Sequence, residues 1–156
     1  MSKKIKKKNI LVLPDSNEKI EKFINFIMKD WKKLLAKKIF RQTLEEIKKN
    51  WHPNPIVVWE QAIENASPNI MIKSKRIWWA VYQVPLEVPM KKRFFYASKW
   101  ILDFARSKKW TPMYKKLAEE LLAAYSGQGS AVKKKEDIHK MADANKAFAY
   151  LAKYVK

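Results

Sequence analysis

Cysteine is absent from this sequence, so the chain cannot form a disulfide, a thiolate metal site or a cysteine nucleophile. No run of about 18 apolar residues occurs, which argues against a transmembrane helix. The apolar stretch at residues 9–13 is too short for a signal-peptide core, which needs about 7–15 residues. We therefore expect a protein of a reducing compartment that is not inserted into a membrane.

Glycine is scarce. It occurs 2 times in 156 residues, whereas average usage of about 7% would give roughly eleven. The two glycines, Gly127 and Gly129, can form neither a GxGxxG nor a GxxxxGK[ST] phosphate loop. His52 and His139 have no HExxH spacing, and the acidic pairs 45–46 and 119–120 are interpreted as solvated helix charges. The sequence thus predicts no enzyme, no metal and no cofactor.

Basic residues dominate the charge: 34 lysines and arginines face 15 acids, a formal net charge of +19. Such a charge repels itself in a compact fold unless a polyanion neutralises it. The cations fall into six clusters, at Lys3–Lys8, Lys32–Lys38, Lys73–Arg76, Lys91–Arg93, Lys108–Lys109 and Lys133–Lys135. One cluster alone would indicate a solvated surface, but six favour nucleic acid as the partner, with an anionic membrane surface as the weaker alternative.

Most of the chain has helical periodicity. Apolar residues at i, i+3, i+4 and i+7 predict helices over residues 17–30, with Ser16 as N-cap, and over 33–49. Asn54-Pro55 predicts the start of a helix that runs to about residue 66. Later helices are expected over 92–108, after Thr111-Pro112 with Tyr125 buried, and over 134–154 with Met141 facing inward.

One segment breaks this pattern. Residues 69–88 contain two β-prone runs around Trp78-Trp79, which predicts a β-hairpin. Pro85 is tolerated because both strands of an isolated ribbon are edges. We therefore expect a mainly α fold, a bundle of about six helices with a protruding β-hairpin. The expected organisation is a basic N-terminal arm at 1–9 and a single domain at 10–156, with its ribbon at 69–88.

Lysine and arginine on a ribbon or near helix ends can meet phosphates both as charges and as hydrogen-bond donors. The wide, shallow groove of RNA favours recognition of this kind. The residues that we expect to contact RNA are Lys3, Lys4, Lys6, Lys7, Lys8, Lys32, Lys33, Lys73, Lys75, Arg76, Tyr82, Lys91, Lys92, Arg93, Lys108, Lys109, Lys133, Lys134, Lys135, His139 and Lys140. A DNA-binding architectural protein is the alternative, and a two-fold dimer would favour it.

Four segments resemble the family of small-subunit ribosomal protein seven. They are AVYQVPLEV at 80–88, KSKR at 73–76, LPD at 13–15 and AVKKKEDIHKMADANKAFA at 131–149. The resemblance covers about residues 9–150, and motifs of this length are highly specific. The chain departs from the family pattern at its end, over 151–156.

This resemblance implies a helical bundle with a protruding ribbon that binds the 3′ major domain of small-subunit ribosomal RNA, in the head of the subunit. It implies early binding that nucleates head assembly, with neighbouring head proteins as partners. It also implies a ribbon near the exit-site transfer RNA and the messenger RNA path. A bacterial cytoplasmic ribosome is the expected location, with an organellar ribosome less favoured and no membrane involved.

Tryptophan, in contrast to glycine, is abundant in this sequence, with 7 residues. The family has glycine at the positions of five of them: Trp31, Trp51, Trp78, Trp79 and Trp110. By contrast, Trp100 matches a family tryptophan and Trp59 a family aromatic. Positions 31, 78 and 79 are predicted to need the left-handed backbone of a helix end or of a type I′ hairpin turn. Either a UGA codon means glycine in the source organism, which the pattern favours, or an aromatic ribbon tip stacks on RNA bases.

Overall fold

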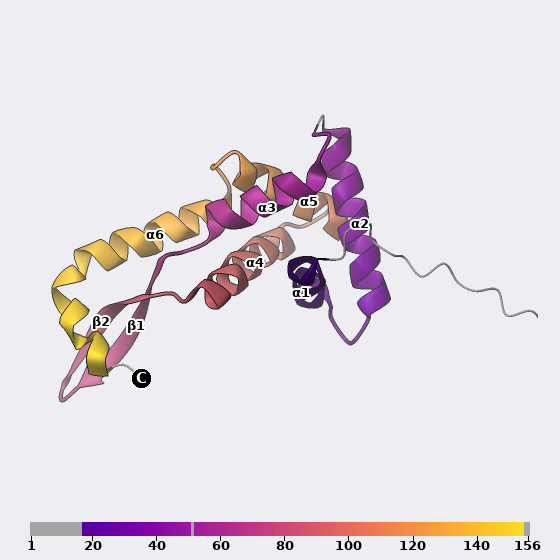
Figure 1. Ribbon diagram of the computed structural model, residues 1–156. Helices are drawn as coiled ribbons and strands as arrows, with labels where there is room; N and C mark the ends of the chain where they lie inside the picture. The colour runs from indigo at the N-terminus through magenta and orange to yellow at the C-terminus, as the bar shows by residue number, and fades with distance from the viewer. Residues whose placement is uncertain (1–16, 51, 155–156) are drawn as a thin grey trace, which may run out of the picture.

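The structure is a computed structural model that describes residues 17–50 and 52–154. In these ranges the chain is mostly helical and carries one antiparallel β-hairpin, which confirms the predicted fold class (Figure 1). The elements are α1 (Glu18–Ile27), α2 (Lys33–Lys49), α3 (Pro55–Ala66), β1 (Ile70–Ile77), β2 (Ala80–Glu87), α4 (Met90–Ser107), α5 (Met113–Tyr125), α6 (Ser130–Ala144) and the 3-10 helix η1 (Lys146–Tyr154). The basic arm at 1–9 lies outside the described residues.

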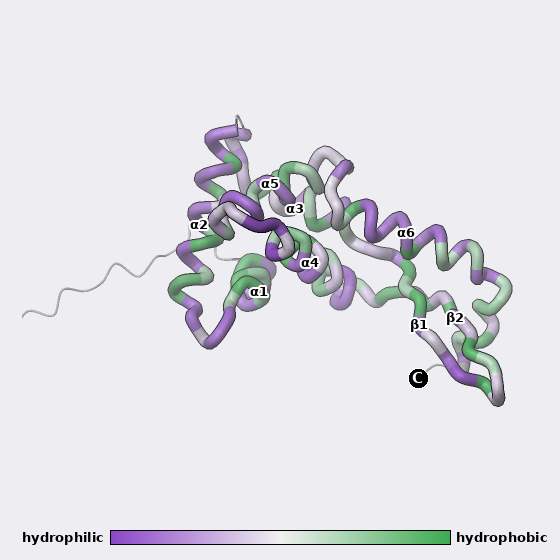
Figure 2. Tube along the Cα trace, turned by 180° about the vertical axis from the view of Figure 1, so that it is seen from behind, coloured by the Kyte–Doolittle hydropathy of each residue, from purple (hydrophilic) through white to green (hydrophobic). Residues whose placement is uncertain are grey.

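The core lies among α1 to α5 and the first turn of α6, and four aromatic rings meet in it. Trp59 on α3 lies edge-on to Phe23, Phe40 and Phe94, with ring centroids 5.4, 6.0 and 6.3 Å away. Each helix has its apolar residues on one face, and this face carries the aromatic rings. Its hydrophilic residues lie on the opposite face, as the alternating colours along α2 show (Figure 2). The core is complete without the hairpin, which projects away from it (Figure 1).

The first helix is shorter than predicted at both ends. Asn17, not Ser16, is its N-cap, and the Asn17 side chain accepts a hydrogen bond from the Lys19 N–H at 3.4 Å. The helix ends at Ile27 and not at residue 30. The Arg106 guanidinium donates to the carbonyls of Phe26 and Ile27, at 3.1 and 3.3 Å, and so satisfies acceptors that the end of the helix leaves unpaired.

The single helix predicted over 134–154 is wrong. α6 begins earlier, at Ser130, and ends at Ala144, and the chain then tightens into η1. Asn145 ends the α-helix because its side chain donates to the Met141 carbonyl at 2.8 Å and its backbone leaves the helical region. Two predicted inward side chains are exposed instead, since Met141 and Tyr125 lie at the margins of their buried helix faces.

Three of the tryptophans adopt backbone conformations that disfavour a β-carbon. The φ angles are 59° for Trp31, 55° for Trp78 and 71° for Trp110. The hairpin pairs Ile77 with Ala80, so Trp78 and Trp79 form its two-residue loop. Trp79 has no positive φ, so the predicted type I′ turn, which needs a positive φ at both residues, is wrong at its second position.

Candidate nucleic-acid interface

The hairpin, α6 and η1 form an arm beside the helical bundle. α6 starts at the bundle and runs toward the hairpin, where η1 packs against β2 (Figure 1). The middle of α6 is strongly hydrophilic, as expected for a helix with lysines at 133–135 (Figure 2). The arm thus presents basic segments from distant parts of the sequence on one extended structure.

The strand register separates the hairpin's side chains into two faces. Lys73 pairs with Val84 and Lys75 with Tyr82, so these four side chains share one face. η1 covers this face: Phe148 meets the Tyr82 ring with centroids 5.2 Å apart, and Val84 is fully buried. Tyr82, which we predicted to contact RNA, therefore has a packing role in the arm.

The opposite face is open and polar. It carries Ser74, Arg76, Val81 and Gln83, all of them exposed. Ser74 and Gln83 are hydrogen-bonded across the strands at 3.1 Å, and the Arg76 side chain donates to the Trp78 carbonyl at 3.4 Å. Arg76 therefore lies on the other face from Lys73 and Lys75.

Two side chains of α6 fix the junction between α3 and the hairpin. Lys135 Nζ donates to the Asn65 carbonyl at 2.8 Å, and His139 Nε2 accepts from the Asn69 N–H at 3.2 Å. Burial lowers the pKa of His139, and the charge of Lys135 lowers it further. The neutral ring that this favours is the form in which Nε2 can accept a hydrogen bond. Both predicted RNA contacts thus orient the arm, a role that the sequence did not reveal.

Cations gather where several helices begin. The first turns of α2, α4, α5 and α6 contain no acidic residue. Lys33 begins α2, and Lys91 and Lys92 follow the first residue of α4. A positive charge at a helix N-terminus opposes the helix dipole, whereas a bound anion complements it. This arrangement favours a polyanionic partner.

Some predicted cations already have protein partners. Lys33 and Lys37 bind Glu21 at 3.0 and 2.8 Å, and hydrogen bonds from Lys37 and Lys33 hold the pKa of Glu21 below its ordinary value. The Arg93 side chain donates to the Val88 carbonyl at 3.0 Å. Other predicted contacts are exposed in the described ranges: Lys32, Lys91, Lys92, Lys109, Lys133, Lys134 and Lys140.

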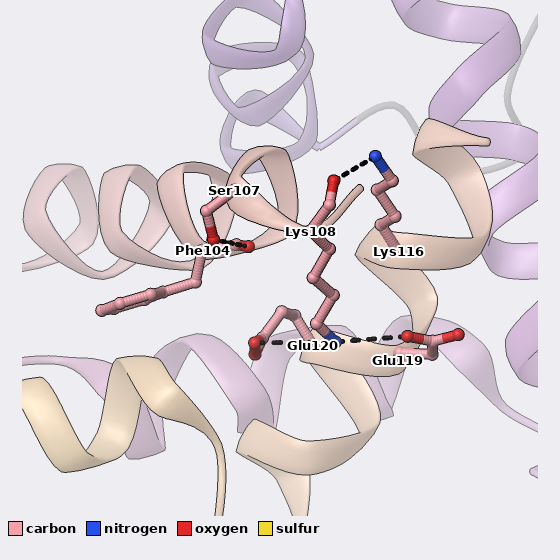
Figure 3. A network of polar contacts seen from close by, with 6 residues as sticks. All are labelled: Phe104, Ser107, Lys108, Lys116, Glu119 and Glu120. Atoms are coloured by element: carbon pink, nitrogen blue, oxygen red, sulfur yellow. Dashed lines mark hydrogen bonds and ion pairs between the residues drawn. The ribbon is translucent and has the colours of Figure 1, made fainter. Parts of the chain in front are cut away.

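Lys108 belongs to a network that holds the connection between α4 and α5 (Figure 3). Its Nζ lies 3.2 Å from Glu119 and 3.8 Å from Glu120, and its carbonyl accepts from Lys116 Nζ. Glu120 is only 3% exposed, so its interpretation as a solvated charge is wrong. Helix periodicity alone could have indicated this, because 117, 120, 121 and 124 share a face.

Replacing Lys108 with alanine is expected to destabilise the fold by about 1–3 kcal/mol, because the buried Glu120 carboxylate loses its cation. Urea denaturation followed by circular dichroism would measure the change. The matched control is Lys109→Ala, which removes an exposed lysine and is expected to change stability by less than about 0.5 kcal/mol. Equal midpoints for the two variants would contradict a structural role for Lys108.

The described ranges contain no helix long and apolar enough to cross a bilayer. Within the same residues, no group of three or more histidine and acidic side chains is arranged to hold a metal ion.

Comparison with known proteins gives a consistent result. The family model for ribosomal protein S7p/S5e matches residues 1–146. The small ribosomal subunit protein uS7 of Pseudothermotoga lettingae is 47% identical over 132 residues, which cover 85% of each chain. The uS7 proteins of Alkalilimnicola ehrlichii and Leptospira biflexa are 42% and 43% identical, over 95% and 94% of this chain and 96% and 94% of their own length.

Proposed function

The chain belongs to the ribosomal protein S7p/S5e family, and from this premise we propose that it is a structural constituent of the small ribosomal subunit that binds ribosomal RNA. The observation that carries the proposal is the family match over 1–146 in a chain of net charge +19. A compact fold with this charge repels itself unless a polyanion neutralises it. Membership of a ribosomal protein family indicates that this polyanion is ribosomal RNA.

The finer assignment is also a proposal. We place the binding site in the 3′ major domain of the RNA, in the head, where early binding would nucleate assembly beside neighbouring head proteins. The hairpin would lie near the exit-site transfer RNA and the messenger RNA. The projection of the hairpin beyond the core supports this placement. The core cluster contains no hairpin residue, so the hairpin is available for contacts with RNA. The bacterial relatives favour a bacterial ribosome over an organellar one.

Sedimentation tests the assignment directly. The tagged protein, expressed in a bacterium, is expected to migrate with small ribosomal subunits on a sucrose gradient and to remain there at moderate salt. Migration only with free protein, or with bulk DNA, would contradict it. The DNA-binding alternative predicts a symmetric dimer, so a monomer that binds structured ribosomal RNA more tightly than duplex DNA would exclude that alternative.

Changing Lys73, Lys75 and Arg76 together to alanine is expected to weaken RNA binding by roughly 10-fold or more while the helical circular dichroism signal is retained. The reason is that the three cations lie on a ribbon outside the core, so phosphate contacts are lost while the packing of the helical bundle is kept. A filter-binding titration against the 3′ major domain would measure the affinity.

The matched control removes the same charge elsewhere. Lys22, Arg41 and Lys49 are exposed helix cations that are paired with Glu18, Glu45 and Glu46 at 2.6, 3.0 and 3.3 Å. Their triple alanine variant lowers the net charge by the same three units but leaves the ribbon intact. Equal losses of affinity in the two triple variants would show that only total charge matters, and would remove the ribbon from the proposed site.

A further inference from the structure

The tryptophans of this protein fall into two groups. Trp59 is buried in the aromatic core, and Trp100 packs against that core beside Tyr96. Trp31, Trp78, Trp79 and Trp110 are 92%, 85%, 89% and 98% exposed, the four highest values among the exposed large hydrophobic side chains of the described residues. Burial of its large apolar surface is what tryptophan contributes to a fold, and the second group contributes none.

The backbone separates the same two groups. Of the 6 described tryptophans, which are the 7 in the sequence less Trp51, three have a positive φ. Only a few per cent of non-glycine residues adopt such angles, and those are mainly asparagine, aspartate and histidine. Among the described residues, the other positive φ angles belong to Asp30, which tolerates them, and to Gly127. A β-carbon is strained at these positions whereas glycine is not.

The four exposed tryptophans of the described residues lie in tight connections. Trp31 links α1 to α2, Trp110 links α4 to α5, and Trp78 and Trp79 form the hairpin loop. Trp51 directly follows Asn50, the C-cap of α2, at the position where glycine is most enriched after a helix. Independent mutations would not be expected to place tryptophan, the bulkiest residue, in each of these connections.

We infer that Trp31, Trp51, Trp78, Trp79 and Trp110 are glycine in the protein as its organism makes it. One codon with two meanings accounts for all five: UGA, read as tryptophan in the printed sequence and as glycine by the organism. Trp59 and Trp100 are then true tryptophans with the ordinary codon UGG. Glycine then occurs at these five positions as well as at 127 and 129, and Trp59 and Trp100 are the tryptophans that remain.

The assignment changes the tip of the hairpin. With glycine at 78 and 79 the tip presents main-chain groups, beside the Arg76 side chain that donates to the carbonyl of residue 78. On the proposed function, such a tip would approach RNA closely by its backbone and not by stacking of indole rings on bases. The tests of residue identity do not depend on RNA binding, so they can fail or succeed independently of the proposed function.

The decisive measurement is peptide mass spectrometry on total protein from the source organism, compared with the gene sequence. We expect UGA codons and glycine at 31, 51, 78, 79 and 110, and UGG codons and tryptophan at 59 and 100. Tryptophan in the peptides that span the five positions, or UGG at those positions, would overturn the inference.

Stability of recombinant protein gives a second test. Changing Trp31, Trp78 and Trp110 to glycine is expected to raise the melting temperature by roughly 2–4 °C per position, because strain is relieved in each connection. The matched control Trp100→Gly is expected to lower it, because that residue lies inside α4 and packs on the core. An unchanged or lower melting temperature for the triple variant would contradict the inference.

Discussion

Raising the salt concentration from about 50 to 200 mM is expected to weaken the binding of this protein to small-subunit ribosomal RNA by roughly 10³–10⁵-fold, if about 6–10 phosphates are contacted. Each phosphate that a lysine or arginine neutralises releases condensed counterions, and added salt opposes that release. The exposed cations at 32, 91, 92, 109, 133, 134 and 140 and those of the ribbon are enough to engage this number.

The slope of log affinity against log salt makes the expectation quantitative. The ribbon triple variant should lower the slope by roughly one for each phosphate contact it removes. The control triple variant on α1 and α2 should leave the slope nearly unchanged, because its cations are paired with glutamates. A flat salt response of the unaltered protein would contradict the basic clusters as the binding surface.

Replacing Trp59 with alanine is expected to destabilise the protein by about 3–5 kcal/mol. This side chain is fully buried and meets three aromatic rings from α1, α2 and α4, so its removal leaves a cavity at the centre of the bundle. The loss is a large fraction of the about 5–15 kcal/mol by which a typical domain is stable. Chemical denaturation monitored by circular dichroism would measure it.

Two companion variants identify the cause. Trp59 Nε1 is buried without a hydrogen-bond partner, so Trp59→Phe removes an unsatisfied donor as well as volume and should cost clearly less than alanine. Trp79→Ala makes the same truncation on an exposed ring and should change stability by less than about 0.5 kcal/mol. A Trp59→Ala variant as stable as Trp79→Ala would show that the aromatic cluster does not hold the bundle together.

Local structure was largely readable from the sequence. The predicted bounds of α2 and α3 match the structure because a sustained apolar period and the Asn54-Pro55 start are local signals. The hairpin was predicted from its two β-prone runs and the break between them. The demand for positive φ at 31 and 78 was equally local, because it follows from the position of each residue after a helix or in a two-residue loop.

The ends of the chain's helices were less predictable where capping decided them. Asn17 and Asn145 set the bounds of α1 and α6 through side-chain hydrogen bonds that compete with neighbouring candidates. Both Ser16 and Asn17 are residue types that cap helices, so the sequence could not select the N-cap of α1. The apolar period continues across Asn145, so nothing in the sequence indicated that α6 ends there. RNA contact by the predicted cations stays a prediction.

The sequence by itself determined the helical class, the ribbon, the excess of positive charge and the positive φ at residues 31 and 78. Only the tertiary structure decided which charged and polar groups serve the fold. Lys135 and His139 find their partners about 70 residues away along the chain, and Glu120 is buried against Lys108. The strand alternation could be read from the sequence, but the covering of the Tyr82 face by η1 could not. Propensity and periodicity act over a few neighbouring residues, whereas these pairings arise from how distant helices pack.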